Sequence, residues 1–224
     1  METFRRYEKK YLLNEMQYQK LMVLLKGHVK PDKFFVAEIS SIYYDNDADE
    51  LIRRSIEKPE YKEKLRIRSY RDAGDDDMVF VELKKKFDGI VYKRRTRALC
   101  ADLLKDVESS AFEDPRVGKE IRYVNEHYGG LSPKIYIGCT RDSYVSKEDP
   151  DLRITFDRDL RYRMEDLNLK KSEKDKILTD MTVMELKVRG AMPMWLIDIL
   201  NDTEAYPRGF SKVGTAYLKE KQGV

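Results

Sequence analysis

The feature that most constrains this chain is a pattern of charge with a period of two residues. In VFVELKKKFDGIVYKRRTRA (79–98), apolar residues recur at every second position of the first half, and the turn signal Asp88-Gly89 follows. Because strand residues two apart point to the same face, the segment predicts a β-hairpin with one strongly charged face. That face would carry Glu82, Lys84, Lys86, Lys93 and Arg95.

The same alternation recurs in other segments, where charged residues share one face and apolar residues lie behind them in most cases. The charged sets are Arg6, Glu8 and Lys10; Lys64, Arg66 and Arg68; Arg141; Arg153, Thr155 and Asp157; and Glu185 with Lys187. Lys9, Lys85 and Arg94 interrupt the pattern, because they fall on the opposite face. The recurrence predicts six or seven strands, each with a polar face that is mostly Arg and Lys.

Such a face has two interpretations. Antiparallel sheets often leave one polar face in water. A solvated face usually mixes charge signs, however, because like charges opposite one another destabilise strand pairing. Two like charges about 6 Å apart repel by roughly 3 kcal/mol at an effective dielectric constant near 20. We therefore favour a barrel whose interior binds a polyanion and whose apolar outer faces are covered by helices.

The rest of the pattern predicts how the chain is organised. The predicted strands are 4–13, 39–45, 63–71, the hairpin 79–98, 134–145, 152–163 and 181–190. The predicted helices are 14–26, capped by Asn14 and ending near Gly27; 48–57; two within 101–128, separated near Asp114-Pro115; one from Pro193; and one after Gly209. Residues 168–180 are expected to be a polar connection. The prediction is a single α+β domain over residues 1–224, a closed antiparallel barrel of about eight strands covered by helices.

Composition and motifs exclude several classes of protein. The chain has 44 Lys and Arg against 41 Asp and Glu, a net charge of +3, so its composition does not indicate nucleic acid as a partner. The sequence lacks an RNP motif, a P-loop, a G-x-S-x-G motif and a kinase signature. His28 and His127 are far apart and are expected to be surface or structural residues.

The cysteines and the apolar segments suggest where the protein acts. Cys100 and Cys139 fit neither a metal-ligand spacing nor a disulfide framework, which favours free thiols in the cytoplasm. No secretory signal or membrane-spanning segment is expected, because no apolar run is long enough. Any membrane association would then need a membrane partner protein.

The residue types on the charged face indicate a chemistry. One guanidinium group can bind two phosphate oxygens at once, and lysine supplies a point charge. Glu8, Glu82 and Glu185 come from different strands and are candidates for a shared divalent cation, Mg²⁺ or Mn²⁺. Glu82 is alternatively a carboxylate that balances charge. The combination is typical of phosphoryl transfer.

These segments also resemble a known family in their order along the chain. The segments are RYEKKY, SIYYD, KLRIRSY, VFVELKKK, YKRR, TRDSY, LRITFDRDL, MELKV and FSKVGTAY. From Arg5 to Tyr217 the chain resembles the VTC domain, the catalytic domain of the vacuolar transporter chaperone complex, in the CYTH or triphosphate tunnel metalloenzyme superfamily. The resemblance implies a tunnel of about eight antiparallel strands with a basic bore. The VTC branch makes polyphosphate from the terminal phosphate of ATP, whereas other members hydrolyse triphosphates or cyclise ATP.

The resemblance also implies roles for residues. Those implied to act on phosphates are Lys10, Arg66, Arg68, Lys84, Lys93, Arg141, Arg153, Lys187 and Lys212. Lys86, Arg95 and Ser211 are added as substrate-binding residues, and Glu185 is implied as the metal ligand, with Glu8 and Glu82 as further candidates. The implied substrates are ATP, triphosphate or polyphosphate, with Mn²⁺ or Mg²⁺ as the cofactor.

The sequence departs from the wider superfamily at its first motif. Hydrolases and cyclases begin with E-x-E-x-K, but here Arg6 stands in place of the first glutamate. This change favours the VTC branch over a two-metal hydrolytic mechanism. The inositol-phosphate-sensing domain and membrane helices of the fungal proteins have no counterpart in this sequence. Three functions stay open at this point: polyphosphate synthesis, triphosphate hydrolysis, and binding of polyphosphate without turnover.

Overall fold

The computed structural model describes residues 6–88 and 90–222. Its strands are β1 (Arg6–Leu13), β2 (Val29–Asp45), β3 (Tyr61–Ser69), β4 (Met78–Phe87), β5 (Ile90–Leu99), β6 (Ser132–Ser146), β7 (Arg153–Arg163), β8 (Lys176–Thr179) and β9 (Thr182–Arg189). Its helices are α1 (Glu15–Leu25), α2 (Glu50–Glu57), α3 (Cys100–Lys105), α4 (Pro115–His127), α5 (Met194–Asp202) and α6 (Lys212–Gln222). The predicted α+β class is confirmed. The first two residues of the predicted strand 4–13 lie outside the described residues.

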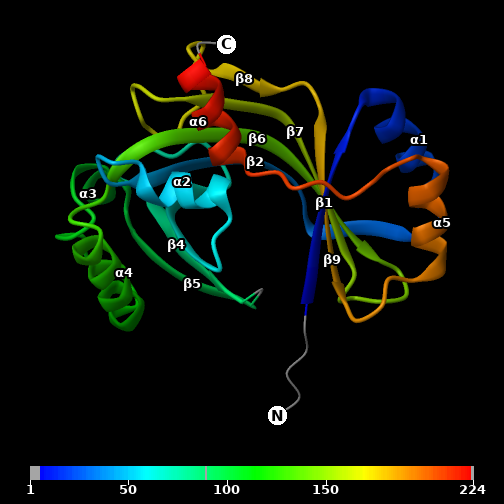
Figure 1. Cartoon of the computed structure of the whole chain (residues 1–224), viewed down its shortest axis with the longest axis horizontal. Helices are drawn as coiled ribbons and strands as arrows, with labels where there is room; N and C mark the ends of the chain where they lie inside the picture. The colour runs from blue at the N-terminus through cyan, green and yellow to red at the C-terminus, as the bar shows by residue number, and fades with distance from the viewer. Residues whose placement is uncertain (1–5, 89, 223–224) are drawn as a thin grey trace. The chain divides into compact units, whose positions relative to one another are not determined.

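The strands form one sheet in the order β1-β9-β7-β6-β2-β3-β4-β5, with β8 paired to β7 (Figure 1). The ladders β1–β9, β2–β3, β3–β4, β4–β5 and β7–β9 are antiparallel, as expected. Among the described residues, this path ends at β1 and β5 without a ladder between them. Closure of the sheet into a barrel therefore stays a prediction.

The contacts divide the chain into two compact units. Unit 1 comprises Met1–Glu38, Cys139–Leu160 and Thr179–Phe210, and unit 2 comprises Ile39–Gly138, Arg161–Leu178 and Ser211–Val224. Segments of the two units alternate along the sequence, which a prediction made from linkers does not reveal. The single-domain prediction stays untested, and each unit is described by itself.

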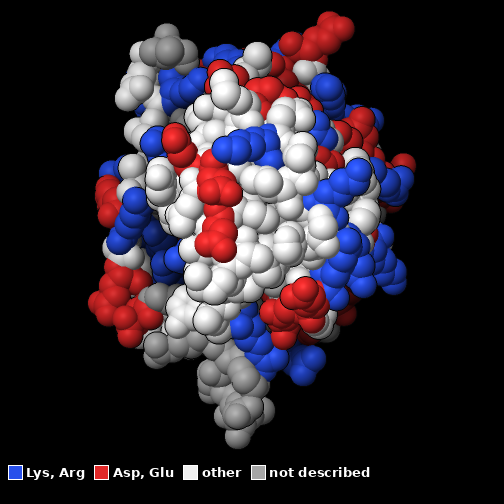
Figure 2. All heavy atoms as spheres, turned by 90° about the vertical axis from the view of Figure 1, so that its right-hand side faces the viewer, with Lys and Arg blue, Asp and Glu red and all other residues white. Residues whose placement is uncertain are grey.

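Unit 1 buries the apolar face of three strands beneath two helices. The strand residues Tyr11, Phe156 and Met184 belong to a core that α1 enters through Leu21 and α5 through Leu196. Figure 2 views the unit from the side of these two helices, and most of the outer surface seen there is uncharged. The apolar side chains of this unit therefore lie on the helix-covered face, which leaves the other strand face for charge.

Helix α1 begins where the sequence predicts. The Asn14 side chain accepts a hydrogen bond from the Gln17 backbone N–H at 2.8 Å, and the Gln17 side chain accepts one from the Asn14 N–H at 3.1 Å. This reciprocal capping box satisfies two N–H groups that a helix end would otherwise leave unpaired.

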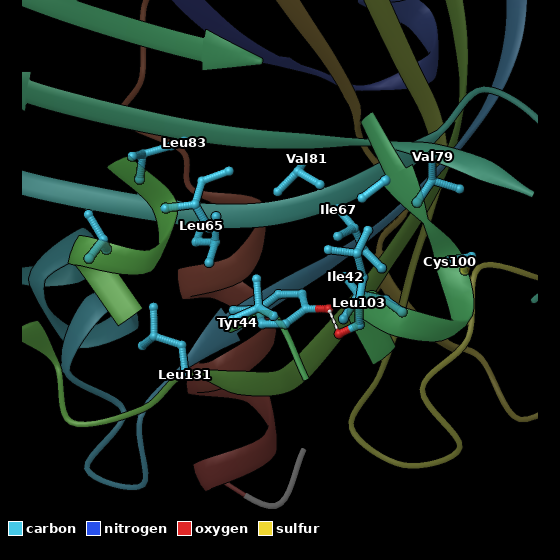
Figure 3. Packing of buried hydrophobic residues seen from close by; sticks show 14 of the residues in the cluster. Ile42, Tyr44, Leu65, Ile67, Val79, Val81, Leu83, Cys100, Leu103 and Leu131 are labelled. Carbon is cyan, nitrogen blue, oxygen red and sulfur yellow. Dashed lines mark hydrogen bonds between the residues drawn. The ribbon is translucent and has the colours of Figure 1, made fainter. Parts of the chain in front are cut away.

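Unit 2 repeats the same arrangement with its own core. Behind β3 and β4, Leu65, Ile67 and Val81 belong to one core with Leu103 of α3 and Ile121 of α4. Figure 3 shows Leu65, Ile67, Val81 and Leu103 in this core. The apolar residues at alternate positions of β3 and β4 are therefore buried, as the period-two pattern predicts.

The end of β2 holds the start of α2 through one carboxylate. Asp45 is buried, and its two oxygens accept hydrogen bonds from the backbone N–H groups of Leu51 at 2.9 Å and Ile52 at 2.7 Å. The residue before the helix, Asp49, makes no capping bond of its own. Asp45 therefore caps a helix that begins five residues later.

Two predicted segments need correction. Strand β2 begins at Val29, ten residues before the predicted strand 39–45. The predicted polar connection 168–180 contains β8, whose residues Lys176–Thr179 pair with β7. In the part of the chain that the structure describes, no helix is both long and apolar enough to span a membrane.

Candidate functional site

The charged face of unit 2 consists of successive rungs across β3, β4 and β5. Residues that face one another in an antiparallel pair lie on the same side of the sheet. The register gives the rungs Arg68-Phe80-Arg97, Arg66-Glu82-Arg95, Lys64-Lys84-Lys93 and Lys62-Lys86-Val91. Successive rungs are about 6.6 Å apart along the strands. The face expected from the sequence is therefore present, and it contains one glutamate among many cations.

Glu82 is the centre of this face and is only 1% exposed. Its Oε2 accepts hydrogen bonds from Arg66 Nε at 2.8 Å and Arg66 Nη2 at 2.6 Å. Its Oε1 accepts one from Arg95 Nε at 2.8 Å and a second from Arg95 Nη2. Lys93 Nζ lies 2.6 Å from the same oxygen. Both carboxylate oxygens are therefore occupied by cations from the two neighbouring strands.

These cations determine the ionisation of Glu82. Burial alone would raise the pKa of this carboxyl, but the charges of Arg66, Arg68 and Lys93 outweigh burial and hold it well below its usual range. The Lys93 pKa is lowered, because burial and repulsion from Arg95 and Arg66 exceed the attraction of Glu82. One carboxylate therefore does not neutralise the cations around it.

The next two rungs contain lysines without a carboxylate among them. Lys84 lies opposite both Lys64 and Lys93, and Lys86 lies opposite Lys62. Burial, followed by repulsion from Lys86, Lys58 and Lys84, lowers the Lys62 pKa. Unit 2 therefore holds a row of like charges that an anion would stabilise.

Strand β2 adds a tyrosine to the same face. Tyr43 lies opposite Arg66, and its Oη accepts a hydrogen bond from Arg66 Nη1 at 2.7 Å. Its neighbour in phase, Ser41, accepts one from Arg68 Nε at 3.0 Å. Burial would raise the Tyr43 pKa, but Arg66, Lys64, Arg68 and Lys212 together lower it to about 7. Positive charge therefore surrounds this phenol.

The start of α6 and two aromatic rings complete the unit 2 cluster. Ser211, just before α6, accepts a hydrogen bond from Lys64 Nζ at 3.1 Å. Arg95 donates a hydrogen bond to Tyr70 Oη at 2.7 Å, and its guanidinium carbon lies 4.3 Å from the centre of the Phe80 ring. These contacts hold Arg95 beside Glu82.

The charged face of unit 1 mixes signs more evenly. Its rungs across β1, β9 and β7 are Glu8-Lys187-Arg153 and Lys10-Glu185-Thr155. Glu185 Oε1 lies 2.6 Å from Lys187 Nζ. Burial would raise the Glu185 pKa, but Lys187, Lys10 and Arg141 hold it below its usual range, so the group is a carboxylate at neutral pH.

Two arginines of unit 1 are engaged with aspartates. Arg141 Nε and Nη2 lie 2.5 and 2.7 Å from the two oxygens of Asp157, which is a two-point pair largely shielded from water. Arg153 is more than half exposed and lies 3.4 Å from Asp32 of β2. Arg141 is therefore held rigidly, whereas Arg153 stays at the surface of its unit.

The oxygen donors near Glu185 are few, and they suit a hard cation whose other ligands come from the substrate. No group of three His, Cys, Asp or Glu side chains with metal-ligating geometry occurs within residues 6–88 and 90–222. Thr155 Oγ1, on the rung of Glu185, is buried and makes no hydrogen bond within that same part of the chain. Mg²⁺ is commonly bound by one or two carboxylates together with substrate phosphates. Glu185 and Thr155 fit such a partial ligand set.

The structure therefore places the predicted residues in two clusters. Those that surround Glu82 or share its face are Arg66, Arg68, Lys84, Lys86, Lys93 and Arg95. Ser211 belongs to the same cluster because it accepts a hydrogen bond from Lys64, and Lys212 belongs to it because its charge lowers the pKa of Tyr43. Those around Glu185 are Lys10, Arg141 and Lys187, with Glu8 and Arg153 on the next rung. Their roles in binding, in metal ligation and in catalysis stay predictions.

Sequence reasoning missed Tyr43, Tyr70 and Lys62. In SIYYD, Tyr43 lies two residues after Ser41 and therefore shares its strand face. Lys62 lies two residues before Lys64 and therefore shares the face of Lys64 and Arg66. The period of two residues was thus a signal for both Tyr43 and Lys62. Tyr70 follows the last residue of β3, where the two-residue period no longer applies.

Comparisons with known proteins agree with this architecture. The model of the VTC domain matches residues 5–220, whereas no curated protein sequence matches the chain. A candidate adenylate cyclase from Bacillus halodurans has a similar structure, with a TM-score of 0.55, 15% identity and coverage of 91% of this chain and 92% of that one.

Two further structures are more distant. The PH1819 protein from Pyrococcus horikoshii OT3 has a TM-score of 0.49 and 14% identity, over 96% of this chain and 99% of that one. A candidate adenylyl cyclase from Hippeastrum with a dominant triphosphatase activity has a TM-score of 0.47 and 14% identity, over 98% and 96%. At 15% identity, the similarity to the Bacillus halodurans structure supports the fold and nothing more.

Proposed function

Because the chain belongs to the VTC domain family, we propose that it catalyses phosphoryl transfer on a triphosphate or polyphosphate chain, with polyphosphate synthesis from ATP as the favoured reaction. The proposal includes the closed tunnel of about eight strands predicted from the sequence. The proposal also includes the cytoplasm as the compartment, which the sequence led us to expect from two cysteines, and both Cys100 and Cys139 are buried.

The observation that carries the proposal is the excess of cations on the unit 2 face. Arg66, Lys93 and Arg95 share the single carboxylate of Glu82, and the adjoining rung consists of lysines alone. Holding like charges together costs free energy unless an anion compensates them. A chain of linked phosphates supplies one negative charge or more per unit along a line, which matches rungs that follow one another along the strands.

The transfer itself needs positioning and charge neutralisation more than covalent chemistry from the protein. An oxygen of the acceptor's terminal phosphate forms a bond to the γ-phosphorus of ATP. The bond from that phosphorus to the β–γ bridging oxygen breaks, and its electron pair leaves with ADP. Arg66, Lys84 and Lys93 would hold phosphate oxygens, and their fixed charge would stabilise the charge that develops on those oxygens.

We propose Mn²⁺ or Mg²⁺ as the cofactor, held by Glu185 with Glu8 on the neighbouring rung. When bound, such an ion neutralises phosphate charge and orients the phosphates. Glu82 is a weaker candidate for the ion, because both of its oxygens already accept hydrogen bonds from arginines. Its geometry favours the charge-balancing role.

Two alternatives use the same residues. In hydrolysis, water replaces the acceptor phosphate, and its proton leaves with the products or solvent. In binding without turnover, Glu185 serves only as the partner of Lys187, and the 2.6 Å contact between them is the observation that favours this reading.

The test is incubation of the protein with ATP and manganese, with ADP, orthophosphate and long-chain product followed together. Long-chain product with matching ADP supports synthesis, orthophosphate without long chains supports hydrolysis, and no turnover with retained triphosphate binding supports a container. Lys93→Ala should weaken triphosphate binding. Arg94→Ala is the matched control, because Arg94 lies on the opposite face and contacts Glu120 at 3.1 Å.

A further inference from the structure

Tyr43 differs from the other residues of the cation cluster, because it brings a hydroxyl proton rather than a positive charge. It is 7% exposed, and its Oη already accepts a hydrogen bond from Arg66 Nη1 at 2.7 Å. Within residues 6–88 and 90–222, the Tyr43 hydroxyl proton has no hydrogen-bond acceptor. Buried hydroxyl groups usually have their hydrogen bonds satisfied, so a donor left without an acceptor needs an explanation.

The surroundings of this proton restrict the possible acceptor. The charged groups with the largest effect on Tyr43 are Arg66, Lys64 and Arg68 of β3 and Lys212 of α6, and these four are cations. A group that enters this environment and accepts a hydrogen bond is favoured if it carries negative charge. Phosphate oxygens are strong acceptors of this kind, and they bind arginine and lysine at the same time.

We infer that Tyr43 is a substrate-binding residue, whose hydroxyl donates a hydrogen bond to a phosphate oxygen that also contacts the Arg66 cluster. The inference deepens the proposed function and rests on it. The Arg66 guanidinium lies between Glu82 on one side and Tyr43 on the other, so the phenol also fixes its orientation. The neighbouring Tyr44 points into the apolar core, where it donates to the Leu103 carbonyl at 2.7 Å (Figure 3).

The inference predicts how binding depends on pH. A phosphate oxygen can accept a hydrogen bond from Tyr43 only while the phenol is neutral. Because the Tyr43 pKa is lowered to about 7, the phenol loses its proton as pH rises through neutrality, and a negative charge replaces the donor. Triphosphate affinity of the wild type should therefore fall across this range relative to that of Tyr43→Phe, which shares the ionisation of the ligand, and bound triphosphate should raise the pKa of Tyr43 in return.

The experiment compares Tyr43→Phe with the wild type, and Tyr44→Phe is the control for loss of a buried phenol from the same strand. Triphosphate affinity is measured by calorimetry in chelator at pH 6 and pH 8, and phenolate is followed by its near-ultraviolet absorption. At pH 6, Tyr43→Phe should bind roughly 10- to 100-fold more weakly, as expected for a lost hydrogen bond to a charged group. It should also lose part of the fall in affinity between the two pH values, whereas Tyr44→Phe should behave as the wild type does.

The absorption readout does not depend on affinity. The wild type should contain a phenolate that titrates near neutrality and disappears when triphosphate is added, and Tyr43→Phe should lack it. If Tyr43→Phe keeps wild-type affinity at pH 6, or if triphosphate leaves the phenolate signal unchanged, the inference is wrong although the proposed function stands. If the wild type binds no triphosphate, both are overturned.

Discussion

Replacing Glu82 by glutamine removes the only carboxylate from the rung that Arg66 and Arg95 share. Breaking a buried ion pair by removing one partner typically costs about 3–5 kcal/mol, because the remaining charge is left uncompensated. Here Lys93 and Arg95 are 45% and 36% exposed and can turn toward water, whereas Arg66 is only 21% exposed. We therefore expect a loss of about 3 kcal/mol in the free energy of unfolding, near the lower end of that range.

Thermal unfolding measures this loss. In a chain of this length, 1 kcal/mol shifts the melting temperature by about 2–4 °C, so Glu82→Gln should melt roughly 6–12 °C below the wild type. Triphosphate should recover more stability for the variant than for the wild type, because the variant's cluster carries one more net positive charge. Glu120→Gln is the control: its partner Arg94 is exposed, and such pairs contribute less than about 1 kcal/mol.

The difference between Glu82→Gln and the wild type should also depend on pH. The Glu82 pKa is depressed in the folded protein, so its contribution is complete above the pKa of an unfolded glutamate, about 4.3, and is lost as pH falls toward the folded value. The gap in stability should hold from neutral pH to about pH 5 and narrow below it. A variant as stable as the wild type at pH 7, or one that gains no more from triphosphate, would refute this account of Glu82.

Three further outcomes are expected. Glu185→Gln should abolish manganese-dependent turnover while metal-free triphosphate binding is kept or tightened, and full activity in this variant would remove Glu185 from the mechanism. Triphosphate at about 100 times its dissociation constant should stabilise the protein by roughly 2.7 kcal/mol; equal shifts in melting temperature from sulfate at matched ionic strength would indicate general screening instead. Lys62→Ala and Lys86→Ala should weaken binding of long polyphosphate more than binding of triphosphate, because their rung lies about 13 Å from that of Glu82; a loss independent of chain length, measured by competition, would contradict an extended site.

The sequence predicts the faces of the strands well, because side-chain direction follows from a period of two. It places Arg66 and Glu82 on a common face and Leu65 behind them, and the structure agrees. It cannot supply register, which decides that Glu82 meets Arg66 on one side and Arg95 on the other. The contacts of both Glu82 oxygens therefore depend on how neighbouring strands pair. The sequence of one strand does not determine that pairing.

Other features are missed for local reasons. The first part of β2 contains Pro31 and no regular alternation, both of which argue against a strand. Because this part was not predicted, the contact between Arg153 and Asp32 was not predicted either. Tyr43 was overlooked since a tyrosine in a strand usually indicates packing, and only its cationic neighbours show another role.

The bonds from Asp45 to the start of α2 limit how this part of the chain can vary in length. The carboxylate reaches the N–H groups of Leu51 and Ile52 only because the intervening loop has its present number of residues. An insertion would leave a fully buried carboxylate without these donors, which is costly. Homologous chains that retain the aspartate should therefore retain this spacing as well, so that an alignment gap between strand and helix should coincide with loss of the acid.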